Sequence, residues 1–478
     1  MPFRSGDREA GWQLPPSLDT LLPATHPVRF VAAYLDSLDA SDWTELGISL
    51  VPADTGASRY HPRILLGLWV WGFMQGVRSA RKLEGAAQEM VSYRWLAGQQ
   101  TPDHNTLWRF YQTHRAGMRY LLTHSVRLAV RAGLVDLALQ AVDGTKIAGN
   151  AAKERTYDAK GLDRLIERTE RAIADLEAQN ATGGEEGPPQ LPEELASREA
   201  LLARIRQAKA ELEPGAQINL TDPAARLMKG RGGFLAGYNA QAVVAPLDET
   251  LASSGGMLIT AAAVTDDPDD HGQLVPMTEQ AARETGQWAA ITLADGGYHS
   301  GETLGATRDH LILMPESQRS SAPYHKDQFP YDPVSDTVTC PKGQRLRFAS
   351  VVQRTGREPV RRYRSTGAVC RACPAFGRCT TDARHGRSVE IGPWEDLLVQ
   401  HRALMATAEA KRIYAQRKQL VEPVFGIQKE QQGARRFLVR GRAAVEAEWR
   451  LLAATFNLRT LARLWQDRPA LLTLGSAG

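Results

Sequence analysis

The chain has 478 residues, of which 43% are hydrophobic and 23% charged, and its formal net charge is +4. These proportions exclude a globally disordered or fibrous protein, and the length is enough for about three domains with packed cores. The longest apolar run, residues 64–74, is too short to cross a bilayer, and the first 16 residues lack the pattern of a signal peptide. We therefore expect a cytoplasmic protein without a membrane partner, in which cysteines are better suited to binding metal than to forming disulfides.

Positive charge is concentrated in the last third of the chain. Residues 341–390 carry a net charge of +9 and residues 401–442 a net charge of +7, whereas residues 156–215 carry −5. Such a distribution is typical of a protein that binds a polyanion such as DNA. The alternative is a solvated basic surface without a partner.

Residues 1–135 are predicted to form a helical N-terminal domain. Apolar residues recur at three- and four-residue spacing over 27–43, 63–77, 80–96 and 105–134. Residues 79–88 and 101–110 have the pattern of a helix-turn-helix, with Thr101 or Asp103 capping the second helix. That helix would present three DNA-binding candidates, His104, Asn105 and Arg109. An ordinary helix pair within a helical domain is the alternative.

Residues 136–330 alternate between predicted strands and helices, which indicates a mixed α/β sheet covered on both faces. The predicted strands are 137–142, 237–244, 257–264, 288–294 and 310–314, and the helices are 269–285 and one that begins near Ser300. Within this region, residues 156–215 are predicted to form a helical hairpin insert with a coiled-coil-like seam. Its negative charge favours packing or a dimer contact over DNA binding.

Residues 331–393 form a basic segment that contains all four cysteines, and residues 394–478 are predicted to be long helices that complete the core. The cysteines are spaced Cys340-x29-Cys370-x2-Cys373-x5-Cys379. Four thiolates with one tight Cys-x-x-Cys pair are enough for a tetrahedral structural Zn²⁺ site. The alternative is four unrelated thiols.

Three acidic residues have the placement of metal ligands. Asp143 and Asp295 each follow a predicted interior strand and precede glycine. Open α/β sheets place functional groups at such strand ends, although a single Asp-Gly is more often a turn. On one continuous helix, Glu422 would share a face with Tyr414, Lys418 and Lys429. Such a face suits metal ions and phosphates, and a solvated Lys/Glu pair is the alternative. Pro423 predicts a kink or a new helix start at Glu422.

Several motifs in a fixed order carry a family resemblance. They are HPRILLGLWVWGFMQGVRSARKLE, TPDHNTLWRF, AVDGTKIAGNA, DPAARLMKGRGGFLAGYNAQ, ADGGYHS, RKQLVEPVFGIQK, RRFLVRG and EWRLLAATFNL. The chain resembles bacterial insertion-sequence transposases of the DDE superfamily, in the branch with a Tyr-x2-Arg-x3-Glu-x6-Lys signature. Glu422 and Lys429 fit that signature, but Lys418 stands at the arginine position, and Tyr414 and Arg417 lie one residue too far from Glu422.

The resemblance implies an RNase H-like catalytic core in which Asp143, Asp295 and Glu422 bind two Mg²⁺ ions. It also implies DNA contacts by residues of the catalytic helix and the basic segment after it, namely Tyr414, Arg417, Lys418, Lys429, Arg435 and Arg436.

The expected activity is that of a DNA transposase, which cleaves and joins strands by two-metal phosphoryl transfer. In this scheme Asp143 bridges both ions, while Asp295 and Glu422 each complete one site. The expected partners are the double-stranded ends of the element, the target DNA and a second copy of the chain on DNA, in the nucleoid of a bacterial cytoplasm. Two alternatives remain at this point: an RNase H-like nuclease that does not join strands, and a transposase-derived DNA-binding protein that is no longer catalytic.

Overall fold

The N-terminal region is a bundle of short helices. The computed structural model describes residues 17–51, 59–182, 192–230, 232–248, 250, 255–316, 323–354 and 357–475. The bundle consists of α1 (Pro27–Asp36), α2 (Ala40–Glu45), α3 (Pro62–Met74), α4 (Ala80–Glu89), α5 (Val91–Leu96), α6 (His104–Met118) and α7 (Tyr120–Arg131). The apolar helix α3 is buried along most of its length, which explains its sequence, and no described helix meets the length and hydropathy needed to cross a membrane.

The structure differs from the predicted helix-turn-helix in one respect. The helix α5 lies between α4 and α6, so these two helices are not joined by a simple turn. Asp103 is the residue that caps α6, because its carboxylate accepts hydrogen bonds from the backbone N–H groups of Asn105 and Thr106, at 2.9 and 3.0 Å. The alternative cap at Thr101 is therefore wrong. A role of α6 in reading DNA stays a prediction.

The central sheet is mixed, as predicted. Its strands are β1 (Leu139–Ala148), β4 (Arg226–Gly230), β5 (Gly233–Pro246), β6 (Met257–Thr265), β7 (Ile291–Leu293) and β8 (Leu311–Leu313). They lie in the order β4-β5-β1-β7-β8, and β6 also pairs with β5. The strands β1, β7 and β8 are parallel, whereas β5 is antiparallel to β1, β4 and β6.

The strand β1 continues further than the sequence predicted. An end before Asp143 is wrong, because antiparallel pairing with β5 extends from Ala141 to Ala148. Parallel pairing of β1 with β7, by contrast, stops at Ala141. Asp143 therefore lies inside β1 but just beyond the end of β7, where the edge of β1 is open.

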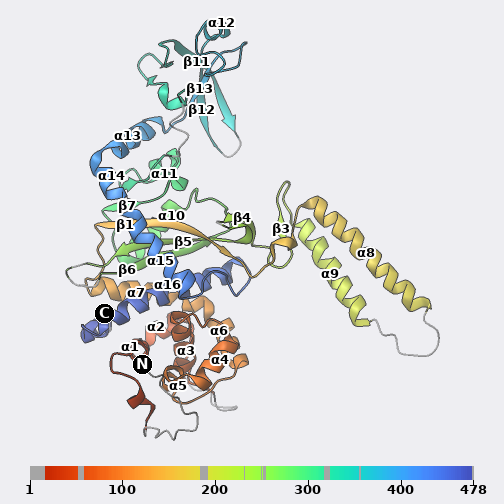
Figure 1. Cartoon of the computed structure of the whole chain (residues 1–478), viewed down its shortest axis with the longest axis vertical. Coiled ribbons are helices and arrows are strands. Elements are labelled where there is room, and N and C mark those ends of the chain that lie inside the picture. Colours follow the sequence, from red (N-terminus) through yellow and green to blue (C-terminus); the bar gives the residue numbers. More distant parts are fainter. Residues whose placement is uncertain are drawn as a thin grey trace, which may run out of the picture.

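Helices cover both faces of this sheet (Figure 1). On one face, α10 (Leu274–Thr285) and α11 (Gly301–Ala306) pack over a cluster that includes Val142 and Val243. On the other face, α7 and the long helix α16 (Arg442–Trp465) bury Ala141, Val244 and Ala262. Adjacent residues of one strand thus enter opposite cores, as strand alternation requires.

A buried ion pair joins the N-terminal helices to α16. The Arg78 guanidinium lies 2.8 Å from Glu448, and the two side chains are 5% and 1% exposed. Glu448 also accepts the backbone N–H of Leu438 at 2.9 Å, while Arg78 donates to the Arg436 carbonyl at 2.7 Å. Burial lowers the pKa of Arg78 and raises that of Glu448, since each charge has left water for the interior.

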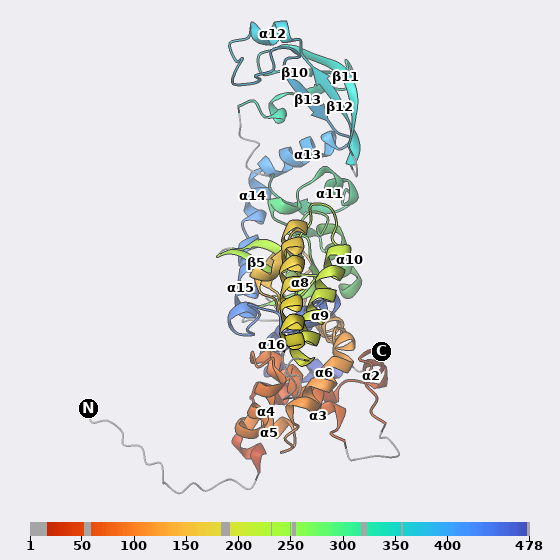
Figure 2. The same ribbon diagram turned by 90° about the vertical axis from the view of Figure 1, so that its right-hand side faces the viewer.

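Two parts of the chain extend away from the central sheet (Figures 1 and 2). Helices α8 (Ala159–Thr182) and α9 (Pro192–Ala210) project sideways where the sequence predicted a hairpin, and the short pair β2 (Thr156–Tyr157) and β3 (Ile218–Asn219) forms its base. At the end opposite the N-terminal bundle, a second sheet consists of β9 (Tyr331–Asp332), β10 (Thr337–Thr339), β11 (Arg345–Arg354), β12 (Arg357–Arg364) and β13 (Ser388–Ile391), with α12 (Gly367–Arg371) beside it.

The chain returns from the second sheet to the central sheet through α13 (Glu395–Ala406), α14 (Ala408–Tyr414) and α15 (Arg417–Glu430). The 3-10 helices are η1 (Leu18–Leu21), η2 (Lys153–Arg155), η3 (Gly296–Tyr298), η5 (Lys326–Gln328) and η6 (Pro469–Gly475).

Candidate active site

The carboxylates of Asp143 and Asp295 both lie near the guanidinium of Arg417. Asp295 follows β7 and caps η3, where its carboxylate accepts the N–H of Gly297 at 2.7 Å. The guanidinium Nη2 of Arg417 lies 2.8 Å from Oδ1 of Asp143 and 3.7 Å from Oδ2 of Asp295. Because β1 and β7 are parallel neighbours, two acids 152 residues apart in sequence meet at the same edge of the sheet.

The electrostatics of this edge favour a bound cation. Burial raises the pKa of Asp143 to about 6; the Arg417 guanidinium acts in the opposite direction, and the negative charges of Asp295 and Asp270 raise the pKa further. Asp143, Asp295 and Asp270 thus repel one another at this edge, and Arg417 and Lys146 lie near them as cations.

Arg417 reaches the aspartates because the helix before it is broken. Residues 414–429 are not one continuous helix: α14 ends at Tyr414, and α15 begins at Arg417 after a two-residue connection. The helix also continues through Pro423, so it does not start afresh at Glu422. The break leaves Arg417 at the start of α15, facing the acids, whereas the extra residue in the signature lies within α15, between Arg417 and Glu422.

Tyr414 lies close to the same charges. Burial raises the pKa of the Tyr414 phenol, and the Asp295 and Asp143 carboxylates raise it further, whereas Arg417 acts in the opposite direction. Tyr414 is thus a neutral hydrogen-bonding group at the border of the site.

The third predicted acid, Glu422, is not part of this contact. Its side chain is exposed, and within the described ranges no hydrogen bond or ion pair joins it to either aspartate. Glu422 lies in α15 between two residues that contact β1: Arg417 contacts Asp143, and Lys429 donates to the hydroxyl of Thr145. In the part of the chain that the structure describes, no three His, Cys, Asp or Glu side chains are placed so that they could hold a metal ion.

A polar network behind the two aspartates was not predicted from the sequence. Asp270 accepts hydrogen bonds from the side-chain amides of Gln241 and Asn239 at 2.7 and 2.8 Å, and the Lys146 ammonium lies 3.8 Å away. Tyr298 donates its hydroxyl proton to the other end of the Gln241 amide. The motifs GYNAQ and ADGGYHS contain Gln241 and Tyr298, but Asp270 lies in the acidic run 266–270, where no spacing distinguishes it.

This network explains the glycine after Asp143. A Cβ atom at position 144 would lie 2.3 Å from Nε2 of Gln241 and 2.5 Å from Oδ1 of Asp270. Because Gly144 has no side chain, Gln241 and Asp270 can pack against the backbone of β1 next to Asp143. The Asp-Gly pair is part of the strand and not a turn.

The remaining DNA-binding candidates lie on several surfaces. His104 is half-buried, with its ring nitrogen 2.8 Å from Glu84, whereas Asn105 and Arg109 are exposed on α6. Lys418 is exposed on α15. Arg435 is exposed and forms an ion pair with Glu430, while the exposed Arg436 lies beside the end of β1. The structure thus brings Tyr414 and Arg417 to the aspartates and leaves the α6 residues on a different part of the molecule.

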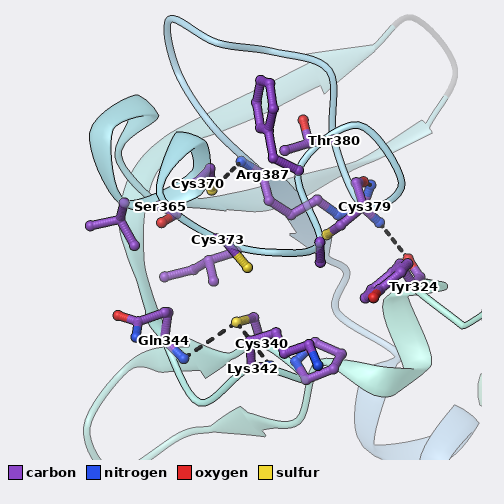
Figure 3. A pocket seen from close by; sticks show the side chains of 15 residues that line it. Tyr324, Cys340, Lys342, Gln344, Ser365, Cys370, Cys373, Cys379, Thr380 and Arg387 are labelled. Carbon is purple, nitrogen blue, oxygen red and sulfur yellow. Dashed lines mark hydrogen bonds between the residues drawn. The ribbon is translucent and has the colours of Figure 1, made fainter.

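The four cysteines line one small cavity in the second sheet domain. Figure 3 shows their sulfur atoms facing the same interior, whose volume is about 30 Å³. The backbone N–H groups of Lys342 and Gln344 donate to the Cys340 sulfur at 3.4 and 3.3 Å, and that of Arg387 donates to Cys370 at 3.3 Å.

The thiols also affect one another electrostatically. Burial raises the pKa of Cys379; the Arg387 guanidinium acts in the opposite direction, and the other three cysteines raise the pKa further. The described cysteines are free and, as they stand, are not arranged as a closed metal site.

Comparison with known families identifies the class of protein. Residues 16–113 match the family described as Transposase domain (DUF772), and residues 339–462 match the family described as Transposase DDE domain. These two matches support an insertion-sequence transposase of the DDE superfamily. The second match includes the cysteine segment, Arg417 and Glu422, whereas Asp143 and Asp295 lie between the two matched regions. Comparison with curated proteins gave no match, and comparison with solved structures gave none.

Proposed function

We propose that this transposase binds the ends of its insertion sequence, cleaves DNA there and joins the freed strands to a target. The observation that carries the proposal is the convergence of Asp143 and Asp295 on one cation at the edge of the sheet. The sheet supports an RNase H-like core, since three antiparallel strands are followed by two strands parallel to β1. Two element ends must be brought together for transposition, so we also propose a homodimer on DNA.

The residues at this edge fit Mg²⁺. Carboxylate oxygens are the ligands this hard ion prefers, and two of them already share one cation. We assign Asp143, Asp295 and Glu422 as the ligands of two Mg²⁺ ions, which when bound would activate the attacking hydroxyl and stabilise the leaving oxygen. Arg417 offsets part of the negative charge of the aspartates, and exposed Lys418 supplies positive charge for the phosphate backbone.

A strand-transfer assay tests this function. The purified protein, with Mg²⁺, is incubated with a labelled duplex that carries the inverted repeat flanking its gene and with a supercoiled target plasmid. We expect nicks at the end of the repeat and labelled plasmid. Cleavage of the duplex without labelled plasmid would show that the protein is a nuclease that does not join strands. Binding of the duplex without cleavage would show that it is a DNA-binding protein that is not catalytic.

We propose that the two basic segments, residues 341–390 and 401–442, face the DNA. Their net charges of +9 and +7 support this, because each neutralised phosphate releases counterions. Affinity for end DNA should therefore fall by about 10³-fold or more between roughly 50 and 200 mM KCl, as measured by fluorescence anisotropy. An affinity that stays constant over this range would contradict the assignment.

We further propose that Cys340, Cys370, Cys373 and Cys379 bind one structural Zn²⁺. The shared cavity and the N–H groups directed at two sulfurs support this, because they stabilise thiolates. Protein purified without chelator should contain about one zinc per chain, and Cys370→Ser/Cys373→Ser should lower both zinc content and thermal stability. Less than half an equivalent of zinc in the unchanged protein would refute the proposal.

A further inference from the structure

A groove opens at the carboxyl end of β1, beside the base of the α8/α9 hairpin. It has a volume of about 630 Å³ and lies between the end of β1, the start of β5 and the segment after α15. The bridge between Ala148 and Arg436 and the hydrogen bond from Phe437 N to the Ala148 carbonyl, at 2.9 Å, hold these parts together. The groove is thus formed by the central sheet itself.

Four cations line this groove: Lys153, Arg155, Arg436 and Arg440. All four are exposed, and among the described residues none forms an ion pair with a carboxylate; the single acid in the lining, Glu154, is not within ion-pair distance of them. Within the ranges that the structure describes, the Arg440 side chain donates to the carbonyl of Asn150, at 3.0 Å, and to no other group.

Two neighbouring arginines differ from those in the groove. Arg435 pairs with Glu430, and Arg442 lies 3.2 Å from Asp266, so both are neutralised within the protein. Arg436 and Arg440 lie between them in the sequence, line the groove and form no ion pair with any described acid. Their charge is therefore available to an external anion.

An aromatic side chain completes the lining. Phe234 is the second residue of β5 and is 59% exposed, although it is large and apolar. Exposed aromatic rings beside cations are typical of grooves that bind single-stranded nucleic acid, because the cations bind phosphates and an unpaired base stacks on the ring.

The groove is also in line with the catalytic candidates. Ala148 is five residues beyond Asp143 in the same strand, which is about 17 Å at the rise of an extended strand. This length is the rise of about five nucleotides in one strand of B-DNA. The Lys429 ammonium, held at Thr145, lies between the two positions and continues the row of positive charge.

We propose that this groove binds the phosphate backbone of the DNA about five nucleotides from the phosphate that is cleaved, with Phe234 against a base or sugar. The inference rests on the proposed function, because it takes Asp143 as the cleavage site. It adds Lys153, Arg155, Arg440 and Phe234 to the DNA-binding surface and assigns Arg436 a place on the DNA.

Salt titration of Lys153→Ala/Arg436→Ala tests the proposal. Neither side chain donates a hydrogen bond within the described residues, so folding should be preserved. The charge-matched control is Arg168→Ala/Arg171→Ala on the projecting helix α8, where the charge balance is negative. With end DNA, the slope of log affinity against log salt should become about two units less steep in the groove variant and stay unchanged in the control.

Neutral methylphosphonates placed singly in the DNA locate the contact. A methylphosphonate about five nucleotides from the cut should lower the affinity of the unchanged protein for the DNA about tenfold. The same substitution should change the affinity of the groove variant little. If the variant keeps the full salt slope while the unchanged protein still cleaves, the groove assignment is overturned and the proposed function stands. If the unchanged protein neither binds nor cleaves end DNA, both fail.

Discussion

Asp143→Asn should abolish DNA cleavage and strand transfer while leaving the affinity for element ends nearly unchanged. Asp143 lies at the centre of the charged edge, 2.8 Å from Arg417, and an amide oxygen cannot supply the negative charge that a bridging ligand needs. Asp295→Asn and Glu422→Gln should have the same effect. The measurement is single-turnover cleavage of a labelled end duplex, with affinity measured in parallel.

The exposed acid Asp309 offers a matched control, because it has the same chemistry but lies at the end of α11, away from the contact with Arg417. Asp309→Asn should cleave at the rate of the unchanged protein. If any of the three catalytic variants kept more than about a tenth of the cleavage rate, the loss would be under about 1.4 kcal/mol of barrier, and that residue would not be a metal ligand.

Glu448→Ala should lower the free energy of unfolding by about 3–5 kcal/mol, because it leaves the Arg78 guanidinium buried without its partner. The backbone N–H groups of Leu438 and Val439 would also lose their acceptor. Urea denaturation followed by tryptophan fluorescence measures the effect, since Trp449 lies next to the substituted residue.

Glu446→Ala is the matched control for this prediction. Glu446 lies two residues away on the same helix and pairs with Arg450, but its side chain is 32% exposed, so its loss should cost under about 1 kcal/mol. The double variant Arg78→Met/Glu448→Met should be more stable than either single Met variant, because no buried charge is left alone. A loss below 1 kcal/mol in Glu448→Ala would show that the pair does not hold the N-terminal helices to α16.

Where the spacing of apolar residues distinguishes a helix from a strand, the sequence predicted the elements well. It placed the end of β1 too early, at residue 142 instead of Ala148. Asp143-Gly144 reads as a turn, and only the pairing of β1 with β5 shows that the strand continues. The reason for Gly144 lies in the distant residues Gln241 and Asp270, which no local pattern relates to it.

The candidate site was predictable in part. The sequence predicted Asp143 and Asp295 at one edge of the sheet because each follows a predicted strand. The two carboxylates do meet there, although β1 continues past Asp143. The position of Arg417 was not predictable, since it depends on the break between α14 and α15. Asp270 was missed because its partners come from β5 and β1, and so only the folded sheet distinguishes it from the other acids of its run.

The central claim is that Asp143, Asp295 and Glu422 belong to one metal site in the working complex. The most direct test is cleavage of the protein backbone by Fe²⁺ bound in place of Mg²⁺, with end DNA, ascorbate and peroxide, because hydroxyl radicals cut only near the ion. We predict cuts near residues 143, 295 and 422, all of them lost in Asp143→Asn. Cuts near 143 and 295 alone would exclude Glu422 from the site, and no specific cuts at any of the three would contradict the metal site itself.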